Sequence, residues 1–128
     1  GGGSFTFGYL NGGDAIEADI ERICWMDSNY AYDDAEKHGD KLLAWLKGDP
    51  SRHLIVFAYN DRAATLNGKP FVSETGGTFY RSKKMIERLR KDVELSETPR
   101  GDFEEYVGMK KQIHFLLHKK FGLFPIAA

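Results

Sequence analysis

Leu54-Ile55-Val56-Phe57-Ala58-Tyr59 is an uninterrupted apolar run that predicts the central strand of a β-sheet. A strand that is apolar at every position is expected to be covered on both faces. Two hairpin signals follow this run, Asn67-Gly68 and Gly76-Gly77. The sequence therefore predicts a small, mostly antiparallel sheet, with its central strand at about residues 54–60 and a meander that extends to about residue 81.

Helices are predicted on both sides of this run. Asp14 and Glu17 form a capping-box pattern for a helix over residues 14–24, and a second helix is expected to end at Gly48. A third helix is predicted over residues 82–95 and a fourth over residues 102–121. Residues 5–10 alternate aromatic with small side chains, which predicts a short strand. The predicted fold class is α+β, with about four helices flanking the sheet.

Length and composition indicate one globular domain. The chain has 128 residues, of which 41% are hydrophobic and 29% are charged, and it is long enough to bury a core. We expect residues 5–128 to form that domain, and residues 1–4, Gly-Gly-Gly-Ser, to be a leader that resembles a linker. Cys24 has no second cysteine in the chain, which favours a reducing, cytoplasmic location. No stretch has the length of apolar sequence that a membrane span needs.

Charge is unevenly distributed along the chain. Residues 1–50 carry ten Asp or Glu against four Lys or Arg, a net −6, and residues 51–128 carry nine against fourteen, a net +5. This asymmetry predicts either two surfaces of opposite sign or an intramolecular interface between them. We therefore expect a small binding or regulatory module, of the inhibitor, immunity or adaptor type, that docks a macromolecular partner through oppositely charged surfaces. A protein is the expected partner, and no membrane is expected.

Two groups of residues are candidates for contact with that partner. Tyr30 and Tyr32 flank Ala31 and precede Asp33 and Asp34, a composition typical of protein recognition loops, although packing of one tyrosine beneath the helices explains it equally well. The second group comprises the basic residues Arg88, Lys91, Lys110 and Lys111 on the third and fourth predicted helices. A homodimer is also allowed, through the strand near Pro70 or the apolar tail 121–126, which alternatively folds back onto the sheet.

An anion site is the second hypothesis. If Ser82 caps the third helix, Lys83 and Lys84 occupy its first turn, where positive charge opposes the helix dipole unless an anion binds. The candidate anion-binding or phosphate-binding residues are Gly76, Gly77, Thr78, Arg81, Ser82, Lys83 and Lys84. With Lys110, Lys111, His114, His118, Lys119 and Lys120 of the fourth predicted helix, they indicate an alternative function, the binding of nucleic acid or a nucleotide phosphate. A plain hairpin followed by a solvated helix explains the same residues.

Catalytic and metal motifs are weak in this sequence. A small enzyme with a dispersed site built from Asp61, Glu74, Arg81 and a histidine is the third alternative. His114 and His118 are four residues apart, a spacing found in helical zinc sites, but no third ligand is identifiable. The prediction is therefore no catalytic residue, no metal site and no cofactor.

Overall fold

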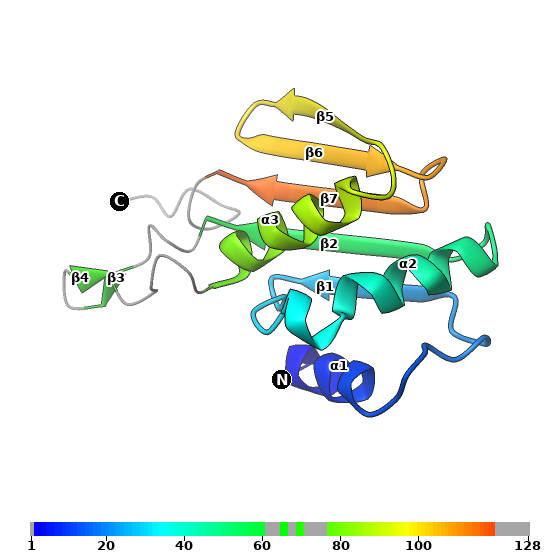
Figure 1. Cartoon of the computed structure of the whole chain (residues 1–128). Helices are drawn as coiled ribbons and strands as arrows, with labels where there is room; N and C mark the ends of the chain where they lie inside the picture. Colours follow the sequence, from blue (N-terminus) through cyan, green and yellow to red (C-terminus); the bar gives the residue numbers. More distant parts are fainter. Residues whose placement is uncertain (1, 61–64, 67–68, 71–76, 120–128) are drawn as a thin grey trace.

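The computed structural model describes residues 2–60, 65–66, 69–70 and 77–119 (Figure 1). In these residues three α-helices and a five-stranded mixed sheet are present, which confirms the α+β class. The elements in chain order are α1 (Gly2–Asn11), β1 (Arg22–Met26), a 3-10 turn η1 (Asp34–Glu36), α2 (His38–Gly48), β2 (His53–Tyr59), β3 (Thr65–Leu66), β4 (Lys69–Pro70), α3 (Gly77–Arg90), β5 (Leu95–Arg100), β6 (Phe103–Gly108) and β7 (Ile113–His118).

The main sheet has the strand order β1-β2-β7-β6-β5. Strands β1, β2 and β7 are parallel to one another, whereas β6 is antiparallel to both β7 and β5. The prediction of a mostly antiparallel sheet is therefore wrong for the β1–β2–β7 half. Its cause is the α2 connection, because a strand that returns through a helix on one face of the sheet runs parallel to the strand before it. The central position predicted for residues 54–59 is confirmed, since β2 lies between β1 and β7.

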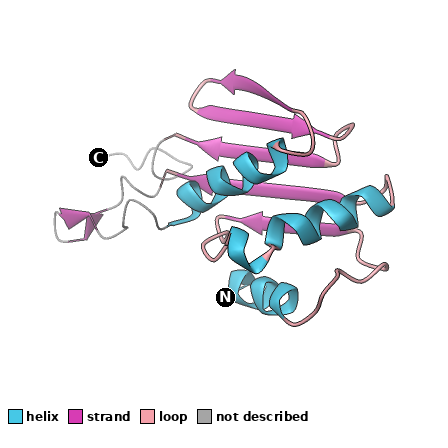
Figure 2. Ribbon diagram, in the orientation of Figure 1, coloured by secondary structure: helices cyan, strands magenta, loops and turns pink. Residues whose placement is uncertain are grey.

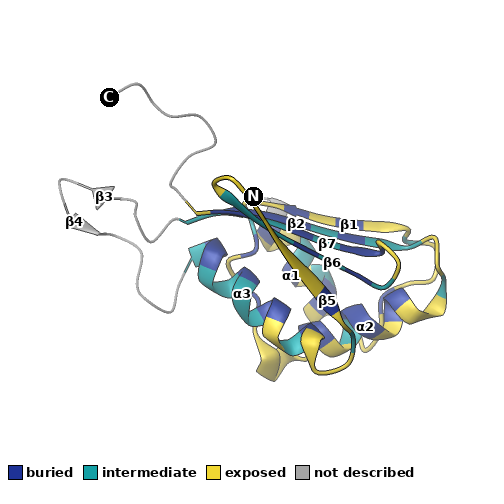
Figure 3. Cartoon of the chain, turned by 90° about the horizontal axis from the view of Figure 1, so that it is seen from above, coloured by how far each residue is buried: buried dark blue, intermediate teal, exposed yellow. Residues whose placement is uncertain are grey.

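All three helices lie on one face of the main sheet, so the described chain forms two layers (Figures 2 and 3). The buried side chains that face the helices alternate along each strand, as Leu54, Val56 and Ala58 do in β2, each 0% exposed. The opposite face of the sheet carries no helix in the described part of the chain. Within the described residues, helices cover β2 on one face, and the prediction of cover on the other face stays a prediction.

The N-terminal elements differ from the prediction. Residues 5–10, predicted as a strand, lie in α1, because Phe7 and Leu10 sit one helical turn apart and both enter the core. The Phe7 ring stacks on Trp25 with ring centroids 5.0 Å apart. Gly2, Gly3 and Ser4, predicted as a leader, form the start of this helix. The predicted helix over residues 14–24 is wrong, since residues 22–26 alternate exposed and buried positions as a strand does.

The predicted fourth helix is also wrong. Residues 95–100 form β5, and residues 102–121 contribute β6 and β7 instead of a helix. Strands β6 and β7 are joined through Met109, Lys110 and Lys111, which have φ angles of 49°, 51° and 74°. Three consecutive residues in the left-handed region end β6 and reverse the chain.

The two hairpin signals have different outcomes. Strands β3 and β4 are antiparallel and flank Asn67-Gly68, so the first hairpin is confirmed, although residues 67–68 lie outside the described residues. The second is wrong, because Gly77 (φ 85°) begins α3 and Thr78 lies in that helix. None of the helices that the structure describes combines the length and apolarity needed to cross a bilayer.

Candidate functional site

The face of the sheet on which no described helix lies, here called the open face, is the first candidate for a binding surface. Strand register places every second residue of the five strands on it. The side chains of this face are Arg22, Cys24 and Met26 of β1, His53, Ile55, Phe57 and Tyr59 of β2, His114, Leu116 and His118 of β7, Phe103, Glu105 and Val107 of β6, and Ser96, Thr98 and Arg100 of β5. Its middle is largely apolar and aromatic, and its ends are basic.

Four rings cluster at one end of the open face. Phe103 and His118 meet edge to face, with ring centroids 4.5 Å apart and planes at 81°. Phe57 meets Tyr59 in the same manner at 5.3 Å, and Tyr59 lies 6.3 Å from His118. Tyr59 and Phe103 stay partly exposed, whereas Phe57 and His118 are 9% and 6% exposed. The two buried rings therefore hold the two accessible rings in place.

Basic side chains extend from this ring cluster along β6 and β7. Arg100 donates from Nε to Glu105 at 2.8 Å, and the Nε2 atom of His114 lies 2.9 Å from the other oxygen of that carboxylate. The hydrogen bonds to His114 and to Arg100 hold the pKa of the Glu105 carboxyl below its usual value. Together with Val107 and the exposed Lys111, these residues line a shallow cleft of about 300 Å³. We call Tyr59, Phe103, Arg100, Lys111, His114 and His118 the basic–aromatic patch.

The predicted anion site takes a different form in the structure. Gly76 lies outside the described residues, and α3 begins at Gly77, so Ser82 is buried in the second turn and does not cap the helix. Lys83 and Lys84 also lie beyond the first turn, which removes the unfavourable dipole contact on which the prediction depended. Lys83 forms an ion pair with Glu104 at 3.4 Å, and Lys84 pairs with Glu87 at 3.5 Å.

The other members of that predicted site have partners within the protein. The Thr78 hydroxyl donates to the carboxylate of Asp27, the residue after β1, at 2.7 Å. The Arg81 guanidinium donates to the backbone carbonyl of Tyr32 at 3.0 Å. The Ser82 hydroxyl accepts a hydrogen bond from the Asn29 side chain at 3.3 Å. These contacts fasten the start of α3 to the segment that follows β1.

The two tyrosines of the predicted recognition loop differ in how far they are buried. Tyr30 is 42% exposed and shares a 2.6 Å hydrogen bond with the Ser4 hydroxyl, whereas Tyr32 is 1% exposed and donates to Asp34. Burial, followed by the neighbouring Asp34 carboxylate, raises the pKa of the Tyr32 hydroxyl. Asp33 caps η1 by accepting from the backbone of Ala35. The alternative in which one tyrosine packs beneath the helices is therefore the observed arrangement.

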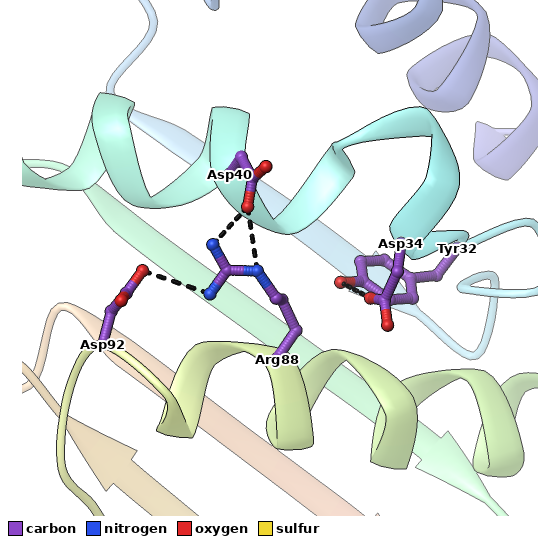
Figure 4. Close-up of polar contacts among 5 residues, drawn as sticks. All are labelled: Tyr32, Asp34, Asp40, Arg88 and Asp92. Atoms are coloured by element: carbon purple, nitrogen blue, oxygen red, sulfur yellow. Dashed lines mark hydrogen bonds and ion pairs between the residues drawn. The ribbon is translucent and has the colours of Figure 1, made fainter.

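The two halves of opposite charge contact each other at the protein surface, at Arg88. Its guanidinium on α3 contacts Asp40 of α2 through both Nε and a terminal nitrogen, and it reaches Asp92 at 3.1 Å (Figure 4). The hydrogen bond to Asp40 raises the pKa of Arg88, so this charge is retained at every physiological pH. Of the two arrangements predicted from the charge split, this contact is the intramolecular interface. Of the remaining basic candidates, Lys91 is exposed after α3, and Lys110 and Lys111 are exposed in the turn before β7.

Only some of the catalytic and metal candidates fall within the described residues. Asp61 and Glu74 lie outside the described residues. Among the residues that the structure describes, no group of three His, Cys, Asp or Glu is placed to hold a metal ion. His114 and His118 do share one face, as predicted from their spacing, but they share it as alternate residues of a strand.

Sequence reasoning missed the aromatic part of the open face. The only signal of a strand was the short alternation Ile113-His114-Phe115, because Phe103-Glu-Glu-Tyr-Val does not alternate apolar with polar residues. Comparison of the chain with protein-family models, with curated proteins and with solved structures found no match.

Proposed function

We propose that this protein is a binding module whose open sheet face binds single-stranded nucleic acid. The observation that carries the proposal is the basic–aromatic patch, in which partly exposed rings and cationic side chains share one uncovered sheet surface. Proteins that bind single strands stack bases on aromatic side chains and track the phosphates with Lys and Arg. The patch offers both kinds of group along β6 and β7, from the rings where Phe103 pairs with His118 to Lys111 in the turn at the other end.

The positions of the rings support base stacking. Tyr59 and Phe103 are accessible, and each is braced by an edge-to-face neighbour that is nearly buried. A braced ring loses little conformational freedom when a base stacks on it. Sheet-based RNA-binding modules present aromatic side chains of adjacent strands in this manner.

The charges around the rings support phosphate contact. The Arg100 side chain is 65% exposed, and the exposed Lys111 lines the same cleft. Glu105 is the acidic residue of this cleft, and its carboxylate contacts Arg100 and His114. With Arg100 and Lys111 against Glu105, a phosphate backbone that follows this cleft meets a net positive charge.

This proposal differs from the prediction of docking through two oppositely charged surfaces, because it assigns binding to one surface that carries both aromatic and basic side chains. The expected docking of a protein through separate charged poles has less support, because Arg88, Lys83 and Lys84 are engaged by Asp40, Glu104 and Glu87. The nucleic-acid alternative keeps Lys111, His114 and His118 as contact residues. It places His114 and His118 on strand β7 and Lys111 in the turn before that strand, with the rings of Tyr59 and Phe103 beside His118.

Fluorescence anisotropy with a labelled oligonucleotide of about 10 nucleotides tests the proposal. We expect binding that weakens about tenfold between about 50 and 200 mM salt, since a few phosphate contacts are involved. Phe103→Ala should weaken binding about tenfold, the loss expected for one stacked base. Arg100→Glu with Lys111→Glu should weaken it further and flatten its salt dependence.

The matched control is Lys47→Glu with Lys91→Glu. It makes the same change of charge on exposed positions of the helical layer, so it should leave most of the affinity intact. Equal losses of affinity in the two double variants would show that net charge alone determines binding, which would contradict a site on the open face. The absence of salt-dependent binding by the unaltered protein would overturn the proposal.

A further inference from the structure

We infer that the free edge of β1 pairs with the same edge of a second copy of this chain, which joins two sheets into one of ten strands. The backbone hydrogen bonds of β1 define that edge. The Glu21 carbonyl accepts from the His53 backbone N–H at 2.9 Å, and the Asp27 N–H donates to the Phe57 carbonyl at 2.7 Å. In a parallel ladder both polar groups of a residue face the same neighbour, so the odd-numbered residues bond to β2.

The backbone groups of the even-numbered residues of β1 consequently point away from β2. These residues are Arg22, Cys24 and Met26, whose backbone N–H and C=O groups point to the free edge and whose side chains are exposed. A row of unpaired donors and acceptors is a template for another strand. The N–H and C=O groups of these three residues, centred on Cys24, can hydrogen-bond to the same groups of an identical strand that runs antiparallel.

The opposite edge of the sheet is protected against such pairing, and the β1 edge is not. Strand β5 carries Pro99 and Glu97, residues of the kinds with which natural sheets block edge pairing. Strand β1 has the sequence Arg-Ile-Cys-Trp-Met, in which Arg22 at the start is the one charged residue and no proline is present. The contrast indicates that the β1 edge is left able to pair.

Exposed apolar side chains surround the same edge. Phe5 is 81% exposed and Met26 is 63% exposed, the two highest values among the large hydrophobic side chains described. An apolar groove of about 350 Å³ runs between α1 and β1 and is lined by residues that include Phe5, Tyr9 and Cys24. A second copy that adds its strand here covers Met26 and approaches Phe5, which accounts for both exposures.

The side-chain register favours a second copy over an unrelated strand. A twofold axis at Cys24 places Cys24 opposite its own copy and Arg22 opposite Met26 of the second copy. No like charges then face each other across the pair. The dimer is isologous, so it closes and uses the β1 edge of both copies completely.

Sedimentation equilibrium measures the monomer–dimer constant, and a short bismaleimide tests the register. We expect a dimer whose copies are cross-linked through Cys24, because directly opposed residues lie about 5.5 Å apart between Cα atoms. Cys24→Ser should abolish the cross-link and keep the dimer. Cys24→Pro should yield a folded monomer, since the proline removes a donor that faces the free edge and leaves the β2 ladder intact.

Two variants at Met26 distinguish a specific effect on strand pairing from a general loss of structure as the cause of a weaker dimer. Met26→Lys places a positive charge opposite Arg22 of the second copy and should raise the dissociation constant about tenfold, since the twofold repeats the repulsion. Met26→Glu places an opposite charge there and should preserve or lower the constant. Thr98→Lys, on the far edge strand, should change nothing. A monomer at all concentrations, or a dimer without the Cys24 cross-link, would overturn the inference.

Discussion

The side-chain amide of Gln112 donates to the main-chain carbonyl of Leu46, 2.8 Å away, across 66 positions of sequence. The same nitrogen lies 2.9 Å from the Asp49 carbonyl and 3.1 Å from the Arg52 carbonyl. One buried amide thus serves carbonyls at the C-terminal end of α2 and in the turn before β2, groups that the helix leaves without partners. This contact ties the start of β7 to the α2–β2 connection.

Gln112→Glu should destabilise the protein by about 1–3 kcal/mol at neutral pH, because it removes a buried donor and places a carboxylate against three carbonyl oxygens. Protonation restores an O–H donor, so the deficit relative to the unaltered protein should shrink as the pH is lowered towards 4. Urea unfolding of both proteins at several pH values measures this. A deficit that does not change with pH would show that the amide acts only by filling space.

Gly39→Ala should destabilise the protein, although alanine is the better helix former by about 1 kcal/mol. A Cβ at position 39 would lie 2.6 Å from Arg88 Cγ and 2.7 Å from the Tyr32 hydroxyl. The matched control is Gly8→Ala in α1, where nothing lies within 4 Å of the added Cβ. Thermal unfolding should show a lower midpoint for Gly39→Ala and an equal or higher one for Gly8→Ala. A rise at position 39 would mean that α2 and α3 are not in close contact.

Protonation of His38 should lower the free energy of unfolding as the pH falls below about 6.5. Burial, with a contribution from the Lys41 charge, lowers the pKa of this imidazole. Its Nδ1 accepts from the Asp33 N–H at 3.1 Å and its Nε2 lies 2.7 Å from Asn11 Oδ1, an arrangement that requires the neutral ring. The unfolded chain therefore binds the proton first, and the stability present above about pH 6.5 is lost on acidification, by up to about 1.4 kcal/mol per pH unit.

The measurement is the free energy of unfolding of the unaltered protein and of His38→Gln between pH 5 and 8. The other histidines are common to both proteins, so the difference between the two curves isolates His38. That difference should narrow on the acidic side, because the variant has no proton to take up at this position. Parallel curves would contradict the prediction.

The sequence predicted the parts of the fold that are marked by local signals. The apolar run of β2 is such a signal, because each of its side chains needs cover or a neighbouring strand. The Asn67-Gly68 dipeptide is another, since Asn-Gly is a preferred sequence for a two-residue hairpin turn. The basic candidates Lys111, His114 and His118 were also identified, although their surroundings were not.

The failure at residues 102–121 has a physical explanation. Tyr106, Ile113 and Leu117 fit one face of a helix, and they also fit one face of two strands joined by a turn. The turn that decides between these structures contains Met109, Lys110 and Lys111 at positive φ, where Gly or Asn is the usual residue. No local signal marked the reversal, so the hairpin could be found only from the sheet that it completes.

The open face was missed for a related reason. Which face of β2 remains uncovered depends on where α2 and α3 cross the sheet, and no single strand carries that information. Phe103 and Tyr59 are 44 positions apart in the chain, and both reach the ring cluster through their contacts with β7.

Pro99 on the outermost strand limits how large an assembly can grow. With one border of the sheet closed to further hydrogen bonding, two molecules that join at the other border have nowhere to add a third in the same way. Fibrillar growth of the amyloid kind, to which apolar strand borders are prone, is thereby stopped after a single pairing step.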